Sequence, residues 1–201
     1  LRVFLGGNVN YRNYDRFSYF GRADYFPDTN YSIVGADNSA IMGYLKQYDE
    51  MIIVKQKLSG DVGIYSRSVT SDKNGRSVFC VKQGISGIGA VSSDCFANLC
   101  DDNLFLCEDG VFGLDTSSIT YQRSATLRSF YVNAKLTAEP DLKYAFCVSQ
   151  GGKYYLFING RVYIADSKQR NTINKTSFGY EWYYWEGVPA KRAASYEDSI
   201  Y

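Results

Sequence analysis

The sequence predicts a mainly β fold, a β-propeller-like array of about four to five short antiparallel blades with one short helix. Two observations support this prediction. The first is composition, because aromatic residues make up 16% of the 201 residues and 18 glycines accompany only 3 prolines. Aromatic side chains suit the pleated, half-buried surface of a sheet, and glycines supply tight turns. The second is a short apolar segment that recurs along the chain.

The recurring segment is apolar and in most copies follows polar turn residues. Its copies contain Val3, Met51, Leu104, Tyr155 and Ile200, at intervals of 48, 53, 51 and 45 residues. A unit of about fifty residues with three or four strands has the dimensions of a propeller blade. Small sheets of this kind bury their faces against their neighbours. A sandwich or barrel stays the alternative, because any all-β chain contains hairpins at irregular intervals.

Turn residues predict that a second strand follows three of these copies. Asp109-Gly110 and Asn159-Gly160 each separate two apolar runs, and Gly60-Asp61 precedes another. Asp-Gly and Asn-Gly are strong hairpin signals, because the favoured two-residue turn needs positive φ at both central residues.

One helix is expected between Ser124 and Ala138. Apolar residues recur there at spacings of three and four, from Leu127 onward. Ser124 is a suitable N-cap, and Pro140 follows the expected end.

We expect residues 1–201 to form a single propeller-like domain excised from a longer protein. The chain has no starting Met, begins with one copy of the recurring segment and ends within another. Either the two ends pair to complete one blade, or the chain is part of a longer propeller.

Composition also restricts the chemistry. The chain has no histidine, which excludes Ser-His and Cys-His nucleophile pairs and histidine metal ligands. The net charge of +1 argues against a dedicated nucleic-acid-binding domain, and no apolar run approaches the ~20 residues of a membrane helix. The five cysteines are an odd number without a signal peptide, which favours free thiols and a reducing cytoplasm.

The remaining polar motifs give no catalytic, metal-binding or cofactor-binding set. The glycines Gly84, Gly87 and Gly89 lack the helix N-terminus that a phosphate-binding loop needs, so close backbone packing explains them better. Four carboxylates surround one predicted hairpin, at Asp101, Asp102, Glu108 and Asp109. They lack the order of a calcium loop, and solvated turn residues are the simplest interpretation.

Two aromatic segments supply the candidate residues for an interaction surface. Near the N-terminus, arginines alternate with aromatic residues, and we single out Tyr11, Arg12, Tyr14 and Arg16. Tyrosine and arginine are enriched at protein interfaces, although the same mixture also suits single-stranded nucleic acid. The second segment contains Trp182 and Trp185. In a strand these two side chains point to opposite faces.

Strand-turn-strand phrases along most of the chain, from about Arg2 to Tyr201, resemble virion structural proteins of tailed bacteriophages and prophages. The segments that carry the resemblance are Asp24–Pro27, Ile33–Gly35, Ala40–Leu45, Met51–Lys55, Gly87–Ser92, Leu104–Phe112 and Tyr154–Tyr163. They look like the β-propeller portion of tail adaptor or nozzle proteins. The resemblance implies a non-enzymatic particle component located in the virion. Its partners would be other tail proteins, in rings around a DNA-conducting channel, with a homo-oligomeric ring as one arrangement.

A carbohydrate-binding or glycan-cleaving propeller is the competing hypothesis. Trp182 or Trp185 would stack on a sugar, and Asp101 or Asp109 would supply carboxylate chemistry. An exposed tryptophan in a cleft would favour this hypothesis, and burial of both would favour a scaffold.

Overall fold

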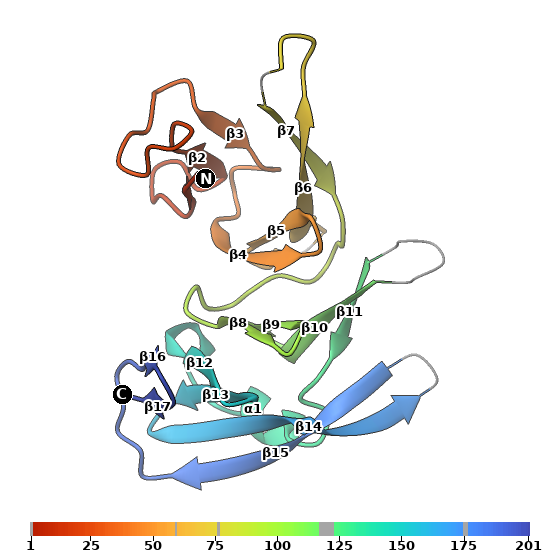
Figure 1. Cartoon of the computed structure of the whole chain (residues 1–201). Coiled ribbons are helices and arrows are strands. Elements are labelled where there is room, and N and C mark those ends of the chain that lie inside the picture. Colours follow the sequence, from red (N-terminus) through yellow and green to blue (C-terminus); the bar gives the residue numbers. More distant parts are fainter. Residues whose placement is uncertain (1, 59, 76, 117–122, 175–176) are drawn as a thin grey trace. The chain divides into compact units, whose positions relative to one another are not determined.

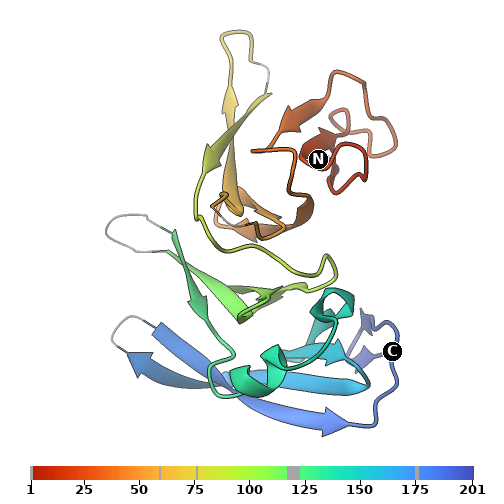
Figure 2. The same ribbon diagram turned by 180° about the vertical axis from the view of Figure 1, so that it is seen from behind.

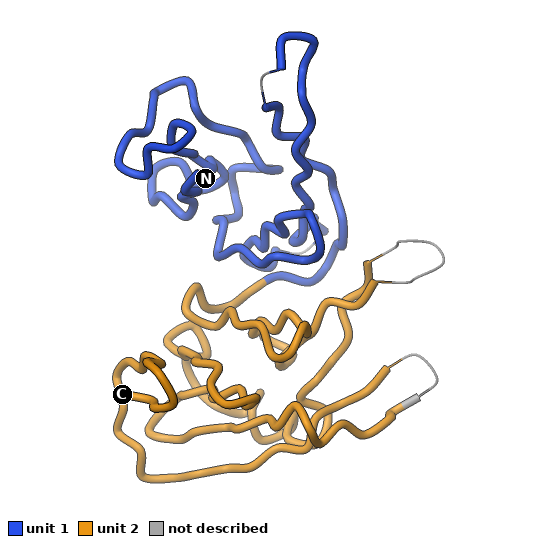
Figure 3. The backbone as a smooth tube through the Cα atoms, in the orientation of Figure 1, with its two compact units in different colours: residues 1–89 blue, residues 90–201 orange. Residues whose placement is uncertain are grey.

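The computed structural model describes residues 2–58, 60–75, 77–116, 123–174 and 177–201. Over these residues the fold is mainly β, as predicted, and it has 53% strand, one short helix and five antiparallel sheets (Figure 1). The chain divides into two compact units, residues 1–89 and 90–201 (Figure 3). The expectation of a single domain over residues 1–201 stays a prediction.

Unit 1 contains two antiparallel sheets, each with its strands in sequence order. The three-stranded sheet consists of β1 (Phe4–Leu5), β2 (Tyr14–Phe17) and β3 (Tyr31–Ile33). The four-stranded sheet consists of β4 (Ile41–Gln47), β5 (Glu50–Lys55), β6 (Ile64–Ser71) and β7 (Ser77–Gln83).

Unit 2 contains two four-stranded meanders and a terminal hairpin. The first meander consists of β8 (Phe96–Leu99), β9 (Asp102–Cys107), β10 (Gly110–Thr116) and β11 (Arg123–Leu127). Helix α1 (Asn133–Thr137) and a 3₁₀ turn (Leu142–Tyr144) lead to the second meander, which consists of β12 (Phe146–Gln150), β13 (Lys153–Ile158), β14 (Arg161–Asn174) and β15 (Ser177–Glu186). In both views β14 and β15 form a long hairpin (Figure 1, Figure 2), and β16 (Ser195–Tyr196) and β17 (Ser199–Ile200) form the last pair.

The recurring segment corresponds to a strand in all five copies, namely β1, β5, β9, β13 and β17. In each four-stranded sheet it is the second strand, and a two-residue turn precedes it. These turns are Tyr48-Asp49, Cys100-Asp101 and Gly151-Gly152. The first residue of each turn has a positive φ, at 53°, 49° and 59° respectively. The repeat seen in the sequence is therefore a repeat of local structure.

The predicted hairpins form, with different turn lengths. Asn159-Gly160 is a tight turn between the paired residues Ile158 and Arg161, with φ of 50° and 73°. Both values are positive, as this turn type requires. At the β9–β10 hairpin, by contrast, Gly110 is already the first residue of the strand and pairs with Cys107. Gly60-Asp61 lies in a longer connection between β5 and β6.

The expected helix over Ser124 to Ala138 is wrong in its first half. Arg123–Leu127 is strand β11, paired with β10 from Thr116↔Arg123 to Phe112↔Leu127, and α1 covers only Asn133–Thr137. The apolar spacing of three and four does not exclude a strand followed by turns. Pairing with β10 satisfies backbone groups that a helix would otherwise satisfy. Ser129 strengthens the junction, because its Oγ accepts a hydrogen bond from the backbone N–H of Val111 at 2.9 Å.

In unit 2, one part of the core lies between the faces of the two four-stranded sheets. In unit 2, side chains of β9 and β10 (Leu104, Leu106 and Val111) pack against side chains of β13 and β14 (Tyr154, Leu156 and Tyr163). In unit 1, Phe4 and Phe17 contact Phe79 of β7 at ring-centroid distances of 5.5 and 4.8 Å.

The five cysteines are free thiols, as expected. Cys95 and Cys107 are buried and Cys80 and Cys147 partly buried, whereas Cys100 is exposed in its turn. Burial raises the pKa of the Cys95 thiol.

Two of the three glycines singled out from the sequence do permit close backbone packing. A Cβ atom on Gly89 would lie 2.6 Å from the carbonyl oxygen of Lys55, and one on Gly84 would lie 2.8 Å from that of Ile64. Gly87 instead has a φ of +76° and open space around it.

We expect Gly89→Ala to lower the free energy of unfolding by about 1–3 kcal/mol, because the added methyl group would meet backbone atoms. Ser86→Ala, at an exposed nearby position, should change it by less than about 0.5 kcal/mol. Urea unfolding of both variants measures the difference. Equal effects would contradict the packing explanation.

Candidate protein interaction surface

The N-terminal sheet separates its side chains by strand alternation. In β2, Asp15 is fully buried and Phe17 packs against Phe79 on the inner face, while Tyr14 and Arg16 belong to the outer face. Across the strands Arg16 is paired with Leu5 on one side and with Tyr31 on the other. Directly opposed residues share a face, so Leu5, Arg16 and Tyr31 form a row on the outside of the sheet.

Tyrosine rings extend this row. The rings of Tyr11 and Tyr14 lie 5.1 Å apart, and Tyr14 stacks on Tyr31 at 5.1 Å with an interplanar angle of 20°. Tyr11 is 51% exposed and Tyr31 is 43% exposed. We call Leu5, Tyr11, Tyr14, Arg16 and Tyr31 the aromatic surface.

A hollow of about 540 Å³ lies against the aromatic surface. Leu5, Tyr11, Tyr14 and Arg16 line it together with the loop Gly6–Asn8. Asn8 holds this loop, because its Oδ1 accepts hydrogen bonds from the backbone N–H groups of Asn10 at 2.9 Å and Tyr11 at 3.2 Å. Three of the four N-terminal residues singled out from the sequence therefore line this hollow, namely Tyr11, Tyr14 and Arg16.

Arg12, the fourth, has another role. Its Nη2 donates a hydrogen bond to Oε1 of Gln56 at 2.8 Å, which ties the N-terminal loop to the segment after β5. Arg16 lies 4.0 Å from Asp28, and both side chains are well exposed, so this pair contributes little to stability. Further exposed aromatic side chains continue along the same segment, namely Tyr19, Phe20 and Tyr25.

The two tryptophans lie in unit 2 and point to opposite faces of β15, as the alternation predicts. The Trp182 indole is partly buried against the core, and its Nε1 donates a hydrogen bond to the carbonyl oxygen of Arg128 at 3.0 Å. Trp185 is 55% exposed, with the Tyr155 ring 6.3 Å away. Trp182 therefore has a structural role, and its assignment to an interaction surface stays a prediction. Trp185 remains accessible.

A buried arginine cluster, which the sequence interpretation missed, connects the two large sheets of unit 2. The Arg128 side chain is fully buried and binds Asp102 through Nε at 2.8 Å and Nη2 at 3.3 Å. Its Nη2 also binds Asp115 at 2.6 Å, and its guanidinium carbon lies 3.7 Å from the centre of the Phe178 ring. Burial lowers the pKa of Arg128, but the two carboxylates outweigh it and raise that pKa overall.

The carboxylates near the β9–β10 hairpin differ in burial, and Asp102 is the buried one. We expected solvated turn residues, yet Asp102 is 6% exposed and also accepts a hydrogen bond from Tyr180 Oη at 2.8 Å. Asp101 and Asp109 are exposed, at opposite ends of the six-residue strand β9. A strand of that length spans about 20 Å, whereas a glycosidase needs its two carboxylates ~5 to 9.5 Å apart. Asp101 and Asp109 therefore do not form a catalytic pair.

Two other buried carboxylates are bound by arginine and tyrosine. Asp15 forms an ion pair with the buried Arg67 and accepts a hydrogen bond from Tyr44 Oη at 2.8 Å. Burial raises the pKa of Asp15, although Arg67 and Tyr44 oppose this.

Glu139 accepts hydrogen bonds from Tyr163 Oη at 2.7 Å and from Arg161 Nη1 at 2.8 and 2.9 Å. Burial raises the pKa of Glu139, but these bonds and one from Asn159 outweigh it, so the pKa is lowered.

Within the described residues, no group of three or more cysteine, aspartate or glutamate side chains is arranged to hold a metal ion. No helix in that part of the chain is long and apolar enough to cross a membrane. No protein-family model matches the sequence, and no curated protein is significantly similar to it.

Arg128→Met should lower the free energy of unfolding by about 3–5 kcal/mol, because it leaves Asp102 buried without its cation. Arg192→Met is the matched control. Arg192 forms an ion pair with Asp94 at 3.1 Å, but its side chain is 74% exposed, so its loss should cost no more than about 1 kcal/mol. Chemical denaturation followed by circular dichroism measures both. Similar losses would contradict the structural role of Arg128.

Glu139→Gln should destabilise the protein at neutral pH by about 1–3 kcal/mol, because it weakens bonds to a buried carboxylate. The folded-state pKa of Glu139 lies below its unfolded value. Its stabilising contribution is therefore present above that unfolded value and is lost as the pH falls through the folded-state pKa. The difference between wild type and variant should shrink below about pH 4. Urea titrations across this pH range measure the difference, with Glu181→Gln, at an exposed position, as the control. A difference in unfolding free energy that stays constant with pH would contradict the stabilising role of the Glu139 carboxylate.

Proposed function

We propose that this chain is a non-enzymatic structural protein of a phage or prophage particle, where the aromatic surface binds neighbouring subunits. The aromatic surface is the observation that carries the proposal. Tyrosine and arginine are enriched at protein interfaces, and exposed contiguous apolar patches mark interaction sites. The phage assignment rests on the resemblance of the strand-turn-strand phrases to tail proteins.

The partners of the buried carboxylates support a structural function. Asp15, Asp102 and Glu139 each receive an arginine and a tyrosine from within their own unit. Carboxylates held in this way stabilise the packing of the sheets and are not presented to a substrate. The proposed mechanism is the rigid display of surface, in which the sheets hold the loops and edges that bind neighbours.

We further propose that the four-stranded sheets are blades of a propeller. Three meanders have the same topology, and in each a two-residue turn whose first residue has a positive φ joins the first two strands, at Tyr48, Cys100 and Gly151. The face-to-face packing of β8–β11 on β12–β15 is the contact that neighbouring blades make. The partners would be other tail proteins or further copies of this chain in a ring, located in the virion and made in the bacterial cytoplasm.

The double variant Tyr11→Ser/Tyr31→Ser tests the aromatic surface. We expect the wild-type chain to self-associate, and the double variant to weaken this by at least tenfold, because two exposed rings are removed from the contact. Tyr144→Ser/Tyr196→Ser is the matched control, since those tyrosines are 69% and 66% exposed in unit 2. Sedimentation equilibrium measures the association constant. A monomeric wild type, or equal losses in both variants, would contradict the proposal.

A glycan-binding module is the second candidate, which the exposed Trp185 beside Tyr155 favours. On the structural proposal, cello- and malto-oligosaccharides should produce no saturable change in tryptophan fluorescence. A saturable change that disappears in Trp185→Phe and persists in Trp182→Phe would instead establish sugar stacking on Trp185.

A further inference from the structure

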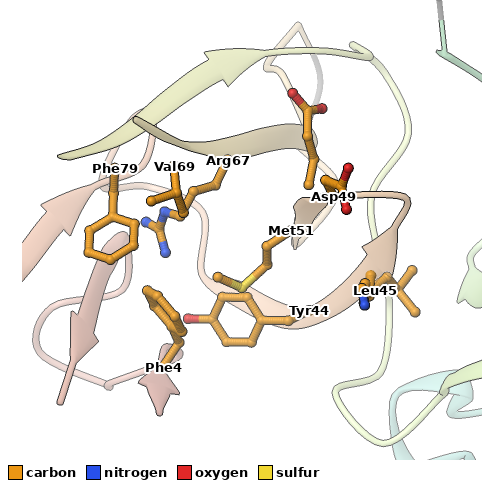
Figure 4. Close-up of a pocket in the computed structure, with 10 residues that line it drawn as sticks. Phe4, Tyr44, Leu45, Asp49, Met51, Arg67, Val69 and Phe79 are labelled. Atoms are coloured by element: carbon orange, nitrogen blue, oxygen red, sulfur yellow. The ribbon is translucent and has the colours of Figure 1, made fainter. Parts of the chain in front are cut away.

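Unit 1 contains a cavity that the proposed function does not use. It has a volume of about 480 Å³ and lies between β1 and the β4–β7 sheet (Figure 4). Its walls are mainly apolar, from Phe4, Tyr44, Met51, Val69 and Phe79, with Arg67 as the buried polar group. Sites for small molecules are typically ~300 to 1,000 Å³ in volume, mostly apolar, with a few polar groups that fix orientation.

Arg67 places buried, unpartnered N–H groups beside this cavity. Its side chain is 1% exposed, and its guanidinium points into the hollow between the rings of Phe4, Tyr44 and Phe79 (Figure 4). Nη2 forms the ion pair with Asp15, but Nε and Nη1 have no hydrogen-bond partner among the described residues. A buried donor without an acceptor costs free energy, and an incoming acceptor atom would recover it.

The surrounding charges determine which acceptor fits. The charge of Arg67 is already balanced by the buried Asp15, and the Phe4 and Phe79 rings lie 4.9 and 5.8 Å from its guanidinium carbon. Asp49 and Glu50 add carboxylates to the lining, while Lys46 adds one cation. The lining thus carries two carboxylates and two cations, so an anion and a cation would each meet like charges there. An uncharged acceptor meets neither penalty.

We propose that this cavity binds an uncharged apolar molecule, of the size of a substituted benzene, that carries one carbonyl oxygen. The oxygen accepts a hydrogen bond from an unpartnered N–H group of Arg67. The apolar part packs against the aromatic rings and Met51.

Four probes with a common phenyl-alkyl body separate the possibilities: 4-phenyl-2-butanone, 3-phenylpropanoate, 3-phenylpropylammonium and butylbenzene. The readout is the ¹³C-methyl NMR signal of methionine, since the chain has two methionines and only Met51 lines the cavity. We expect the ketone to shift the Met51 signal saturably, with a Kd of about 1 mM or tighter, and to leave Met42 unchanged. No saturable shift with any probe, or tighter binding of a charged probe, would overturn the proposal.

Variants locate the binding and test the role of Arg67. Val69→Phe should fill the cavity and weaken ketone binding by at least tenfold, whereas Val78→Phe, on the neighbouring strand and outside the cavity, should change it by less than about twofold. Arg67→Lys keeps a cation opposite Asp15 but changes the donor geometry, so the preference for the ketone over butylbenzene should fall at least fivefold. An unchanged affinity in Val69→Phe would overturn the proposal even if Arg67→Lys did not fold.

Discussion

Buried guanidinium–carboxylate pairs are the interaction on which the packing of both units depends. In unit 2, Arg128 takes its carboxylates from β9 and β10 and its aromatic neighbour from β15, so one side chain connects two sheets. In unit 1, Arg67 of β6 forms an ion pair with one carboxylate, that of Asp15 in β2. Removing one partner of a buried ion pair leaves an uncompensated charge and is strongly destabilising. The pairs therefore fix the position of one sheet on the other more specifically than apolar contacts do.

The two faces of the N-terminal sheet follow from this constraint. Asp15 must point inward to reach Arg67, and strand alternation then places Tyr14 and Arg16 on the outside. The same alternation in β15 directs Trp182 toward the core and leaves Trp185 exposed. In both strands, successive residues therefore contribute in turn to the core and to the exposed surface.

The features of the fold that depend on neighbouring residues could be predicted from the sequence, whereas those that depend on distant residues could not. The aromatic composition, the recurring segment and Asn159-Gly160 depend on neighbouring residues, and the structure confirms the strands and the turn they predict. The Arg128 cluster joins residues that lie 26 and 50 positions apart, and no local pattern reveals such pairs. The helix expected over the residues of β11 is wrong for a related reason, since the pairing of β11 with β10 is a tertiary contact. Alternation along β2 could have separated Asp15 from Tyr14 and Arg16.

We have proposed that this chain is a structural component of a phage particle, and the composition of purified particles tests this proposal. Quantitative mass spectrometry of purified particles, from the phage or prophage that encodes this chain, measures its copy number. We expect peptides from both units at a constant stoichiometry to the major tail proteins, before and after high-salt washing. Absence of the chain from intact particles, with the protein present in the lysate, would contradict it.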